Sequence, residues 1–530
     1  MVTTILGGIG MFLLGMVLLT DSLKTAAGGA LRSVLGRFTG GTARAVASGA
    51  ALTALVQSSS ATVLTTIGFV SAGLLTLRQA TGVIFGATIG TTSTGWLVSL
   101  LGLKLSIGSI ALPLVGVGAL MHLLARNRTG AIGLAIAGFG LIFVGIDVLQ
   151  QGMAALGERL DPSDLPPPGV GGRLLLVLVG AGMTIVMQSS SAAVATTLTA
   201  LHSGAITLEH AAALVVGQNI GTSATAGLAA IGASVPARRT AVAHILLNTG
   251  TGAIAFFLVP LFVRAEPALA AAVGADEHAV MIAAFHTAFT ILGVLVFAPA
   301  IGPFTRLLER LVPERAGTLT RNLDPSVAEL PQVAVEAARR TVMRTAEVAV
   351  GVLAAALRDP RRGRLPADRL AAAGDAVRET RHFLGRVRTS AEADEHARHL
   401  SVHHALDHLG RLLERIEHHT PEDGAPHPAF DEMRRRAHEL MPAVLAWLVE
   451  DGPEAPADAL QRLADDVAER RRDERERTLA RTAGGELDPD VADARLAAMR
   501  WLDSSLYHVW RLTHHLAAPD PVAAADSPAA

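Results

Sequence analysis

The chain has 530 residues, half of them hydrophobic, and a formal net charge of −2 at pH 7. A charge this close to zero excludes the strongly basic surface that a nucleic-acid partner requires. The absence of cysteine excludes disulfides, thiol chemistry and cysteine-ligated metals. Charged residues are sparse before residue 312 and recur every few positions after it. This contrast predicts an all-α protein with a polytopic membrane part followed by a soluble helical part.

Several apolar stretches of the membrane part are about as long as a helix that crosses a bilayer. They cover residues 4–23, 80–102, 106–125, 130–152, 208–232, 239–263 and 279–302. Two further apolar segments, 43–76 and 172–203, are interrupted at their middles by polar residues. Each is long enough for two half-length helices, which predicts a pair of re-entrant hairpins. The N-terminus lacks a basic region and a cleavage site, so its apolar stretch is expected to be retained as the first helix.

The interruptions of the two segments are copies of one motif. The sequence Gln-Ser-Ser-Ser-Ala at 57–61 recurs at 188–192, and Gly-x-x-Ile-Gly-Thr at 86–91 recurs at 217–222 with the same offset of 131 positions. Gly8, Gly10 and Gly15 align with Gly138, Gly140 and Gly145 at an offset one residue shorter. This pattern predicts a first transmembrane repeat over 1–128, a second over 129–265 and a final transmembrane helix over 279–312. Polar motifs at matching places in two apolar halves indicate a transporter's binding site.

The arginines predict the orientation of these repeats. Most arginines of the membrane part fall on the cytoplasmic side when the N-terminus is placed outside. Each repeat then contains an odd number of full crossings, so the two copies insert upside down relative to each other. Their hairpins enter from opposite sides and their tips are expected to meet near the midplane, as in alternating-access transporters. The same threading places the C-terminal part in the cytoplasm and the protein in the plasma membrane.

The motifs suit an anion together with a hard cation. The free backbone NH groups and the dipole at the start of a hairpin's second helix favour an anion. The serine hydroxyls donate to an oxyanion or present oxygen to sodium, and each glutamine adds two donors and one acceptor. The paired glycines, Gly86 with Gly90 and Gly217 with Gly221, are expected to permit an unwound helix whose free carbonyls bind sodium. No Asp, Glu, Lys or Arg lies in these motifs, which argues against a proton relay.

On these motifs the chain resembles the type II sodium–phosphate cotransporters, in the bacterial form with a PhoU-like helical domain. The resemblance covers roughly residues 1–312 and implies transport of inorganic phosphate with sodium as the coupling ion. Residues carried over to the binding site are Gln57, Ser58, Ser59, Ser60, Gln188, Ser189, Ser190 and Ser191, with Thr91, Thr92, Asn219, Thr222 and Ser223 as further members. Ala87-Thr88 stands where the second copy has Gln218-Asn219, so which copy binds phosphate and which binds sodium stays open. Transport direction and stoichiometry are open as well.

The C-terminal part, residues 330–518, is predicted to form an antiparallel bundle of about six helices. Apolar residues recur at helical spacing at Val335, Ala338, Val342, Ala346, Ala349 and Leu353. The resemblance to a PhoU-like domain rests on this helix pattern and on position, and it implies regulation. His399, His403 and Asp407 lie four residues apart and are weak candidates for a metal site, although a solvated polar face is the favoured interpretation. Residues 519–530 are expected to be disordered.

Three other functions are alternatives to sodium–phosphate cotransport. A carrier for another oxyanion or for a carboxylate fits the same architecture, although a carboxylate carrier often uses a cationic side chain and the motifs have none. A membrane phosphate sensor that signals through the helical domain is the alternative from a different class. An enzyme is disfavoured, and no cofactor is expected, because no nucleophile–base pair or carboxylate pair lies at the repeated motifs. A homo-oligomer or a regulatory partner of the helical bundle stays open.

Overall fold

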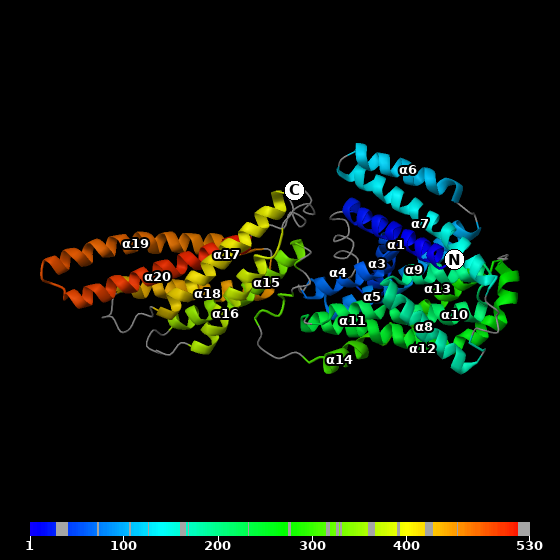
Figure 1. Cartoon of the computed structure of the whole chain (residues 1–530). Helices are drawn as coiled ribbons and strands as arrows, with labels where there is room; N and C mark the ends of the chain where they lie inside the picture. Colours follow the sequence, from blue (N-terminus) through cyan, green and yellow to red (C-terminus); the bar gives the residue numbers. More distant parts are fainter. Residues whose placement is uncertain are drawn as a thin grey trace. The chain divides into compact units, whose positions relative to one another are not determined.

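The structure is a computed structural model. It describes residues 1–27, 41–71, 74–104, 108–125, 127–159, 166–167, 169–231, 233–273, 277–313, 319–324, 328, 331–358, 366–388, 393–418, 428–452 and 454–517. Every regular element in these residues is a helix, which confirms the all-α prediction (Figure 1). The predicted disordered tail, 519–530, lies outside the described residues.

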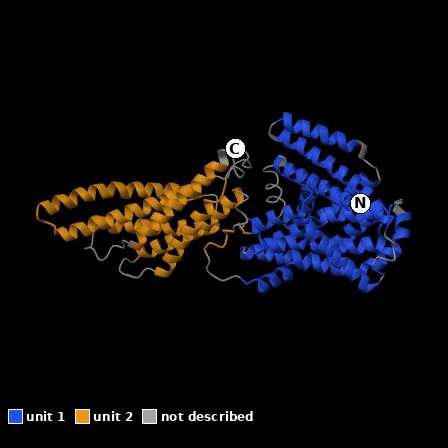
Figure 2. Ribbon diagram, in the orientation of Figure 1, with its two compact units in different colours: residues 1–70, 74–314 blue, residues 71–73, 315–530 orange. Residues whose placement is uncertain are grey.

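The chain separates into two compact units (Figure 2). Unit 1 consists of Met1–Val70 and Leu74–Glu314, and unit 2 consists of Ser71–Gly73 and Arg315–Ala530. The boundary near residue 314 coincides with the point where charged residues become frequent in the sequence.

Unit 1 holds the apolar helices and both polar motifs. Its first elements are α1 (Val2–Ala27), α3 (Thr42–Val56), α4 (Ser59–Ser71), α5 (Leu77–Trp96), the π-helical segment η1 (Leu97–Lys104) and α6 (Gly108–Leu124). They are followed by α7 (Asn127–Gly157), α8 (Val170–Met187), α9 (Ser190–His202), α10 (Leu208–Gly221), α11 (Ser223–Ala229), α12 (Val235–Val273), α13 (His278–Phe297) and α14 (Ile301–Leu311). The order of elements from α1 to α6 corresponds to the order from α7 to α12, and α13 and α14 follow.

Six helical stretches among the described residues are long and apolar enough to cross a membrane. They are Val2–Thr25, Leu77–Leu103, Arg128–Gly157, Val170–Met187, Val235–Ala271 and His278–Phe297. Three details differ from the sequence prediction. The stretch 208–232 is divided into α10 and α11, and the apolar part of α6, Ile110–Leu124, is shorter than the other spans. With 18 residues, α8 is as long as a full span although it was expected to be one arm of a hairpin.

Glycines join the first arm of each hairpin to the span that follows it. A Cβ atom on Gly86 of α5 would lie 1.9 Å from the carbonyl oxygen of Val46 in α3. At the equivalent place in the second half, a Cβ atom on Gly217 of α10 would lie 2.0 Å from the carbonyl oxygen of Val177 in α8. In the first copy the expectation that these glycines unwind the helix is wrong, because α5 runs without a break from Leu77 to Trp96. In the second copy the helix is interrupted, since α10 ends at Gly221 and α11 begins at Ser223. The glycines are needed because two helix backbones approach too closely for any side chain.

Helices α1 and α7 pack against each other along a second set of glycines, and α6 packs on the other side of α7 (Figure 1). A Cβ atom on Gly8 would lie 3.0 Å from the Gly145 carbonyl oxygen, and one on Gly15 would lie 2.7 Å from the Gly138 carbonyl oxygen. Residue numbers therefore rise along α1 while they fall along α7, so the two helices are antiparallel. These are the glycines that align in the sequence repeat.

The described residues of unit 2 form a bundle of six helices. They are α15 (Pro331–Arg358), α16 (Ala367–Leu384), α17 (Ala393–His418), α18 (Pro428–Glu450), α19 (Ala457–Ala483) and α20 (Pro489–Leu516). The apolar face predicted for α15 is buried at all six positions, from Val335 to Leu353. This face packs against α16, α17 and α18, while α20 packs against α17 and α19. The bundle core is thus built from the helical periodicity that the sequence displays.

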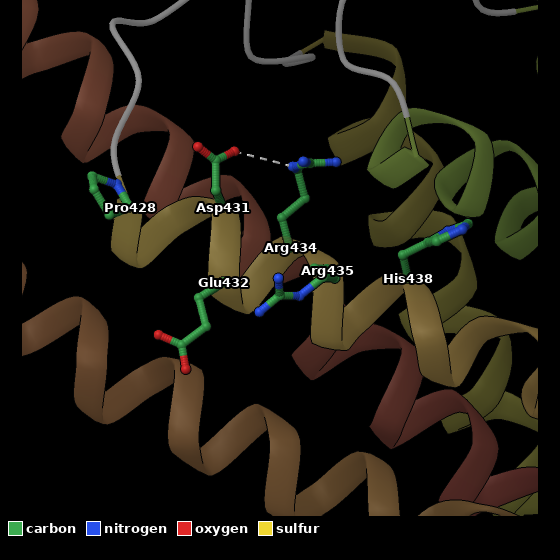
Figure 3. A pocket seen from close by; sticks show the side chains of 6 residues that line it. All are labelled: Pro428, Asp431, Glu432, Arg434, Arg435 and His438. Carbon is green, nitrogen blue, oxygen red and sulfur yellow. Dashed lines mark ion pairs between the residues drawn. The ribbon is translucent and has the colours of Figure 1, made fainter.

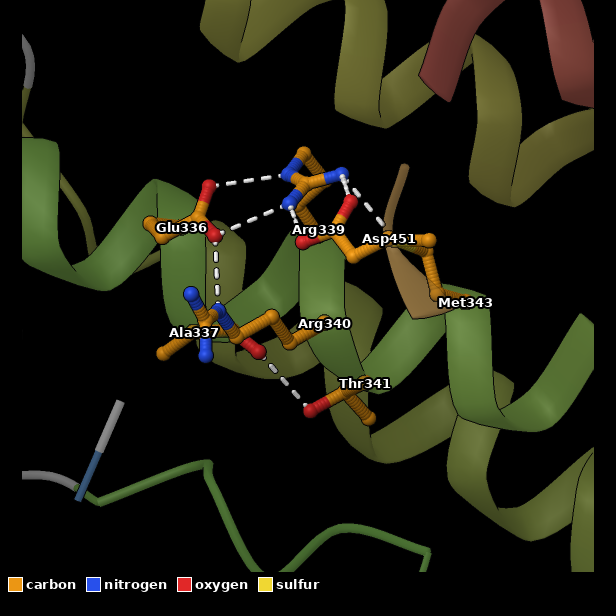
Figure 4. Close-up of polar contacts among 7 residues, drawn as sticks. All are labelled: Glu336, Ala337, Arg339, Arg340, Thr341, Met343 and Asp451. Atoms are coloured by element: carbon orange, nitrogen blue, oxygen red, sulfur yellow. Dashed lines mark hydrogen bonds and ion pairs between the residues drawn. The ribbon is translucent and has the colours of Figure 1, made fainter. Parts of the chain in front are cut away.

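A network of charges fixes the end of α18 against α15 (Figure 4). The Arg339 guanidinium donates to Glu336 Oε2 over 2.8 Å and to Asp451 Oδ1 over 2.9 Å. Burial alone would raise the pKa of Asp451, but the hydrogen bonds and charge of Arg339 outweigh burial and hold this pKa below its ordinary value. Asp451 also has a left-handed backbone (φ 51°), which turns the chain after α18. Because Asp451 is partly exposed, solvent screening limits the pair to about 1 kcal/mol or less of stability.

We expect Gly217→Ala to destabilise unit 1, because its methyl group would meet a carbonyl oxygen that cannot move aside as a side chain does. The cost should lie at the upper end of the range for overpacking, about 3 kcal/mol. Gly182→Ala in α8 is the matched control, since its methyl group would have no atom within 4 Å and alanine favours the helix. Thermal unfolding of the purified chain in detergent measures both. Equal melting temperatures for the two variants would contradict close packing at Gly217.

Candidate functional site

Both Gln-Ser-Ser-Ser motifs break the helix in the same way. Gln57 (φ 55°, ψ 28°) ends α3 and Gln188 (φ 51°, ψ 22°) ends α8, each in the left-handed conformation. Apart from Asp451, no other described residue except glycine has a positive φ. Such a conformation costs about 1 kcal/mol or more for a residue with a side chain, and it persists mainly at functional sites. The duplicated motif therefore encodes a duplicated and strained turn.

The serine after each glutamine caps the helix that follows. Ser58 Oγ accepts from the Ala61 NH over 3.2 Å, and Ser189 Oγ accepts from the Ala192 NH over 3.2 Å. The new helices α4 and α9 begin at the next residue. Each turn therefore presents a helix N-terminus with nearby serine hydroxyls, an arrangement that attracts anions. Ser59, Ser190 and Ser191 are buried, Ser58, Ser60 and Ser189 are half-buried, and Gln188 is exposed.

The two hairpin tips are joined through one hydroxyl group. Thr94 Oγ1 of α5 donates to Gln57 Oε1 over 3.0 Å and lies 3.1 Å from Ser191 Oγ of α9. Gln57 Nε2 also donates to Ser93 Oγ over 3.0 Å. The structure thus brings the first motif and the second motif together, as the sequence predicted for the tips. Sequence reasoning missed Thr94, although it follows the candidate Thr91 by three residues and so lies on a neighbouring part of the same helix face.

The threonines of the Gly-x-x-Ile-Gly-Thr motifs are bonded to their own helices. Thr91 donates to the Ala87 carbonyl, Thr92 to the Ile89 carbonyl and Thr222 to the Gln218 carbonyl. In the first copy the continuous helix keeps the carbonyls that were expected to bind sodium, whereas in the second copy the helix is interrupted at Thr222. Thr92 Oγ1 additionally accepts from Thr287 Oγ1 of α13 over 3.0 Å, which connects the first repeat to the last long helix.

The second copy contains a polar cluster that the first copy lacks. Asn248 Nδ2 of α12 donates to Ser223 Oγ over 3.2 Å and lies 2.9 Å from His244 Nε2. Asn219 is buried and its Nδ2 atom has no hydrogen-bond partner. A buried donor without a partner is costly and indicates a group that a ligand or water satisfies. Asn219 and Ser223 are therefore the candidates of this motif with polar atoms directed away from their own helix.

The two copies also differ in the buried hydrogen bonds beside their hairpins. Gln218 Nε2 donates to Thr197 Oγ1 over 2.6 Å and to the Ala193 carbonyl over 3.1 Å. Ala87 replaces Gln218 in the first copy, and there Thr53 Oγ1 donates to Thr62 Oγ1 over 2.9 Å. The first hairpin is thus tied internally by a pair of buried hydroxyls, whereas in the second half the amide of Gln218 ties the following span, α10, to α9.

A surface hollow of about 290 Å³ lies in unit 2 (Figure 3). Its lining residues all belong to α18 and are Pro428, Asp431, Glu432, Arg434, Arg435 and His438. Asp431 and Arg434 form an ion pair over 3.5 Å, and the remaining charges are mixed in sign. The hollow contains no residue of the repeated motifs, and its balanced charge favours no particular ligand.

The three weak candidates for a metal site in α17 do not form a common site. His399 Nε2 and His403 Nε2 lie 3.1 Å apart, but Asp407 pairs with Arg411 over 3.1 Å. Among the residues that the structure describes, no group of three or more potential ligands could hold a metal ion. The histidine-rich face is therefore better explained as a polar surface of the bundle.

A different histidine pair lies between α17 and α20. His408 Nδ1 and His508 Nδ1 are 3.0 Å apart. When both imidazoles are neutral, one of these nitrogens carries a hydrogen and donates it to the other. Burial, followed by the charges of His408, Arg411 and Arg415, lowers the pKa of His508 to about 4 from its ordinary 6.5. Burial, followed by the charge of Arg511, also lowers the pKa of His408. The folded state therefore favours the neutral imidazoles.

We expect the contact between α17 and α20 to weaken in acid. Because the pKa of His508 is lowered in the folded state, its stabilising contribution is complete above pH 6.5 and is lost as the pH falls toward 4. Hydrogen exchange of α17 and α20 peptides in the full-length chain, corrected for intrinsic rates, should show this loss of protection. The double variant His408→Leu/His508→Leu should reduce the pH dependence, with His515 of α20, whose pKa is also lowered to about 4, still contributing, and the exposed control His382→Leu should retain it in full. Equal pH profiles for all three proteins would contradict the assignment.

Much of unit 1 is similar to known proteins. Residues 11–151 and 170–297 match the model of the Na+/Pi-cotransporter family, which is just over half of the chain. The "Uncharacterized protein YqeW" of Bacillus subtilis is 30% identical over 304 residues, 57% of this chain and 96% of that protein. The "Putative inorganic phosphate export protein YjbB" of Escherichia coli is 28% identical over 346 residues, 64% of this chain and 62% of that protein.

A shorter match reaches an animal protein. The human "Sodium-dependent phosphate transport protein 2C" is 36% identical over 118 residues, 21% of this chain and 20% of that protein. No solved structure matches the chain. The family match, together with six helices able to cross a bilayer, shows that the chain is a multi-pass membrane protein and a transport protein rather than an enzyme. The chain belongs to the Na+/Pi-cotransporter family.

Proposed function

We propose that the chain moves inorganic phosphate across the plasma membrane together with sodium, by alternating access. The observation that carries the proposal is the pair of hairpin turns at Gln57 and Gln188, which share one strained conformation and are joined through Thr94. The relatives named for phosphate export and for sodium-dependent phosphate transport support the choice of substrate and coupling ion.

The proposed site uses neutral groups to bind a charged substrate. Phosphate would accept hydrogen bonds from serine hydroxyls and from NH groups at the starts of α4 and α9, where helix dipoles favour negative charge. Sodium would use hydroxyl and amide oxygens and would reduce the repulsion between phosphate and the protein's own acceptors. The hairpin members are Gln57, Ser58, Ser59, Ser60, Gln188, Ser189, Ser190 and Ser191, and the members from the spans are Thr91, Thr92, Asn219, Thr222 and Ser223.

The two halves, residues 1–128 and 129–265, are proposed to be inverted repeats followed by a final helix within 279–312. Support comes from the glycine contacts of α1 and α7. The repeat alignment converts the pair Gly8–Gly145 into the pair Gly138–Gly15, and both pairs are in contact. Such a pair of equivalent contacts between antiparallel helices is expected when the two repeats are related by a twofold axis in the membrane plane. The hairpins would then enter the membrane from opposite sides.

The bundle within residues 330–518 is proposed to be a cytoplasmic, PhoU-like regulatory domain. The concentration of arginine on one side of the threaded membrane part supports this side as the cytoplasm. Regulation would act on the direction or the rate of transport. The membrane potential contributes to transport as well, by about 2.3 kcal/mol per net charge moved per 100 mV. The relatives' names include both an exporter and sodium-dependent transporters, so both directions belong in the assay.

The first test is radiolabelled phosphate flux in proteoliposomes, measured inward and outward with a sodium or a potassium gradient. We expect sodium-dependent flux in the wild type and its loss in the double variant Gln57→Ala/Gln188→Ala. Sulfate and a dicarboxylate serve as competing substrates. If correctly inserted protein carries no phosphate in either cation, the proposal fails and another anion or a sensing role becomes the better explanation.

Gln188→Gly separates the shape of the turn from the chemistry of its side chain. Glycine prefers the left-handed conformation of residue 188, so we expect the melting temperature to be unchanged or higher. Phosphate flux should nevertheless fall by at least about tenfold, because the amide group is removed. Gln188→Ala should lose flux and also stability. Normal flux in the glycine variant would show that the motif serves the turn alone.

A further inference from the structure

In the part of the chain that the structure describes, Thr94 is the side chain that connects the two hairpin tips directly. It is 4% exposed, lies in α5 of the first half, and contacts Gln57 at one tip and Ser191 near the other. Ser191 is 7% exposed. Both hydroxyls are therefore removed from solvent, where a hydrogen bond between them is stronger and its loss is more costly.

The repeat provides each of these three residues with a counterpart. The same offset of 131 positions converts Thr94 into Thr225, Gln57 into Gln188 and Ser191 into Ser60. The counterparts are not joined in this structure. Thr225 Oγ1 donates to the Thr222 carbonyl over 3.0 Å within its own helix turn, and Gln188 Nε2 donates to the Ile185 carbonyl over 2.6 Å. Hydrogen bonds therefore join Thr94 to Gln57 and Ser191, whereas Thr225 and Gln188 bond to carbonyl groups of their own turns.

We propose that Thr94 and Thr225 are alternating positioning residues that latch the hairpins in the two opposite-facing states of the transporter. In the state not seen here, Thr94 releases Ser191, and Thr225 bonds to Gln188 and Ser60 instead. The proposal rests on the proposed function, since it assigns parts to its alternating access. Two copies of one structural unit can each adopt the conformation of the other. Exchanging the two conformations turns a transporter that faces one side of the membrane into one that faces the other side.

The two latches are not equal in strength. Gln57 Nε2 bonds to Ser93 Oγ in addition to the bond from Thr94, whereas the counterpart of Ser93 is Ala224. The first latch therefore has one hydrogen bond that the second cannot form. One such bond corresponds to roughly a fivefold change in population, so the state seen here is the favoured one in the absence of ligands. Ser93→Ala should make the two states more equal.

Disulfide trapping tests the exchange directly, because the natural chain contains no cysteine. The pairs Thr94→Cys/Ser191→Cys and Ser60→Cys/Thr225→Cys are introduced separately into the full-length chain in proteoliposomes and exposed to a mild oxidant. We expect the first pair to form a disulfide readily without ligands. The second pair should form one slowly, and about fivefold faster when Ser93→Ala is added, while the first pair slows. Each single-cysteine variant is the control.

The trapping result is independent of whether phosphate is the substrate, since it requires no flux. Opposite responses of the two pairs to Ser93→Ala support the latches even if the wild type carries no phosphate. Overturning results would be a second pair that never forms a disulfide, or a first pair that is fully oxidised while flux remains at the wild-type rate.

Hydroxyl removal gives the second measurement. Thr225→Val should reduce flux as much as Thr94→Val, by at least about fivefold, although Thr225 bonds only to its own helix in this structure. Thr225→Ser and Thr94→Ser, which keep the hydroxyl group, should restore flux to within about twofold of the wild type. If Thr225 had only a structural role, its exchange for the similarly shaped valine would leave flux unchanged, and that outcome would overturn the proposal.

Discussion

A helix that is interrupted at membrane depth must satisfy the backbone groups that the interruption frees, because hydrocarbon offers them no partner. The hairpin turns meet this constraint with two neighbouring residues. The left-handed glutamine reverses the chain direction and returns its side-chain amide to the carbonyl three residues earlier, and the following serine accepts from the first free NH groups of the next helix. The remaining free NH groups at the start of a helix attract negative charge. The proposed binding of an anion would thus be a consequence of how the break is stabilised.

The glycine contacts keep this arrangement in place. Each hairpin's first arm lies against the next span at backbone-to-backbone distance, at Gly86 and Gly217, so the strained turns at Gln57 and Gln188 are held from outside. Glycine also explains the main error of the sequence interpretation. A glycine pair within an apolar segment fits an unwound helix as well as a helix that another backbone approaches closely. Sequence spacing does not distinguish these cases, because the difference depends on which helix lies alongside, and only the fold determines that.

The helical content, both hairpin breaks and the apolar face of α15 could be predicted from the sequence, because each is a local pattern of at most a few turns. Thr94 could not, since its importance comes from Ser191, which is 97 positions away along the chain. The metal hypothesis failed for a similar reason. His399, His403 and Asp407 have suitable spacing on one helix, but Arg411 stands a further four residues on and binds the carboxylate. Local spacing identifies side chains that are able to meet, whereas competing partners decide whether they do.

The differences between the two copies carry as much information as their identity. A perfectly symmetric pair of tips would offer the same groups to both ligands and would give the two opposite-facing states equal energy. Here Gln218, Asn219 and the Ser223–Asn248–His244 cluster add amide and imidazole groups to the second half, while the first half has Ala87, Thr88 and the additional Ser93 bond. Substitutions of this kind leave the shared turn geometry intact, because the glutamine, the serine cap and the packing glycines are unchanged. Under the proposed alternating access, the shared turn geometry would give two equivalent states, and these substitutions would distinguish the two binding places and favour one state over the other.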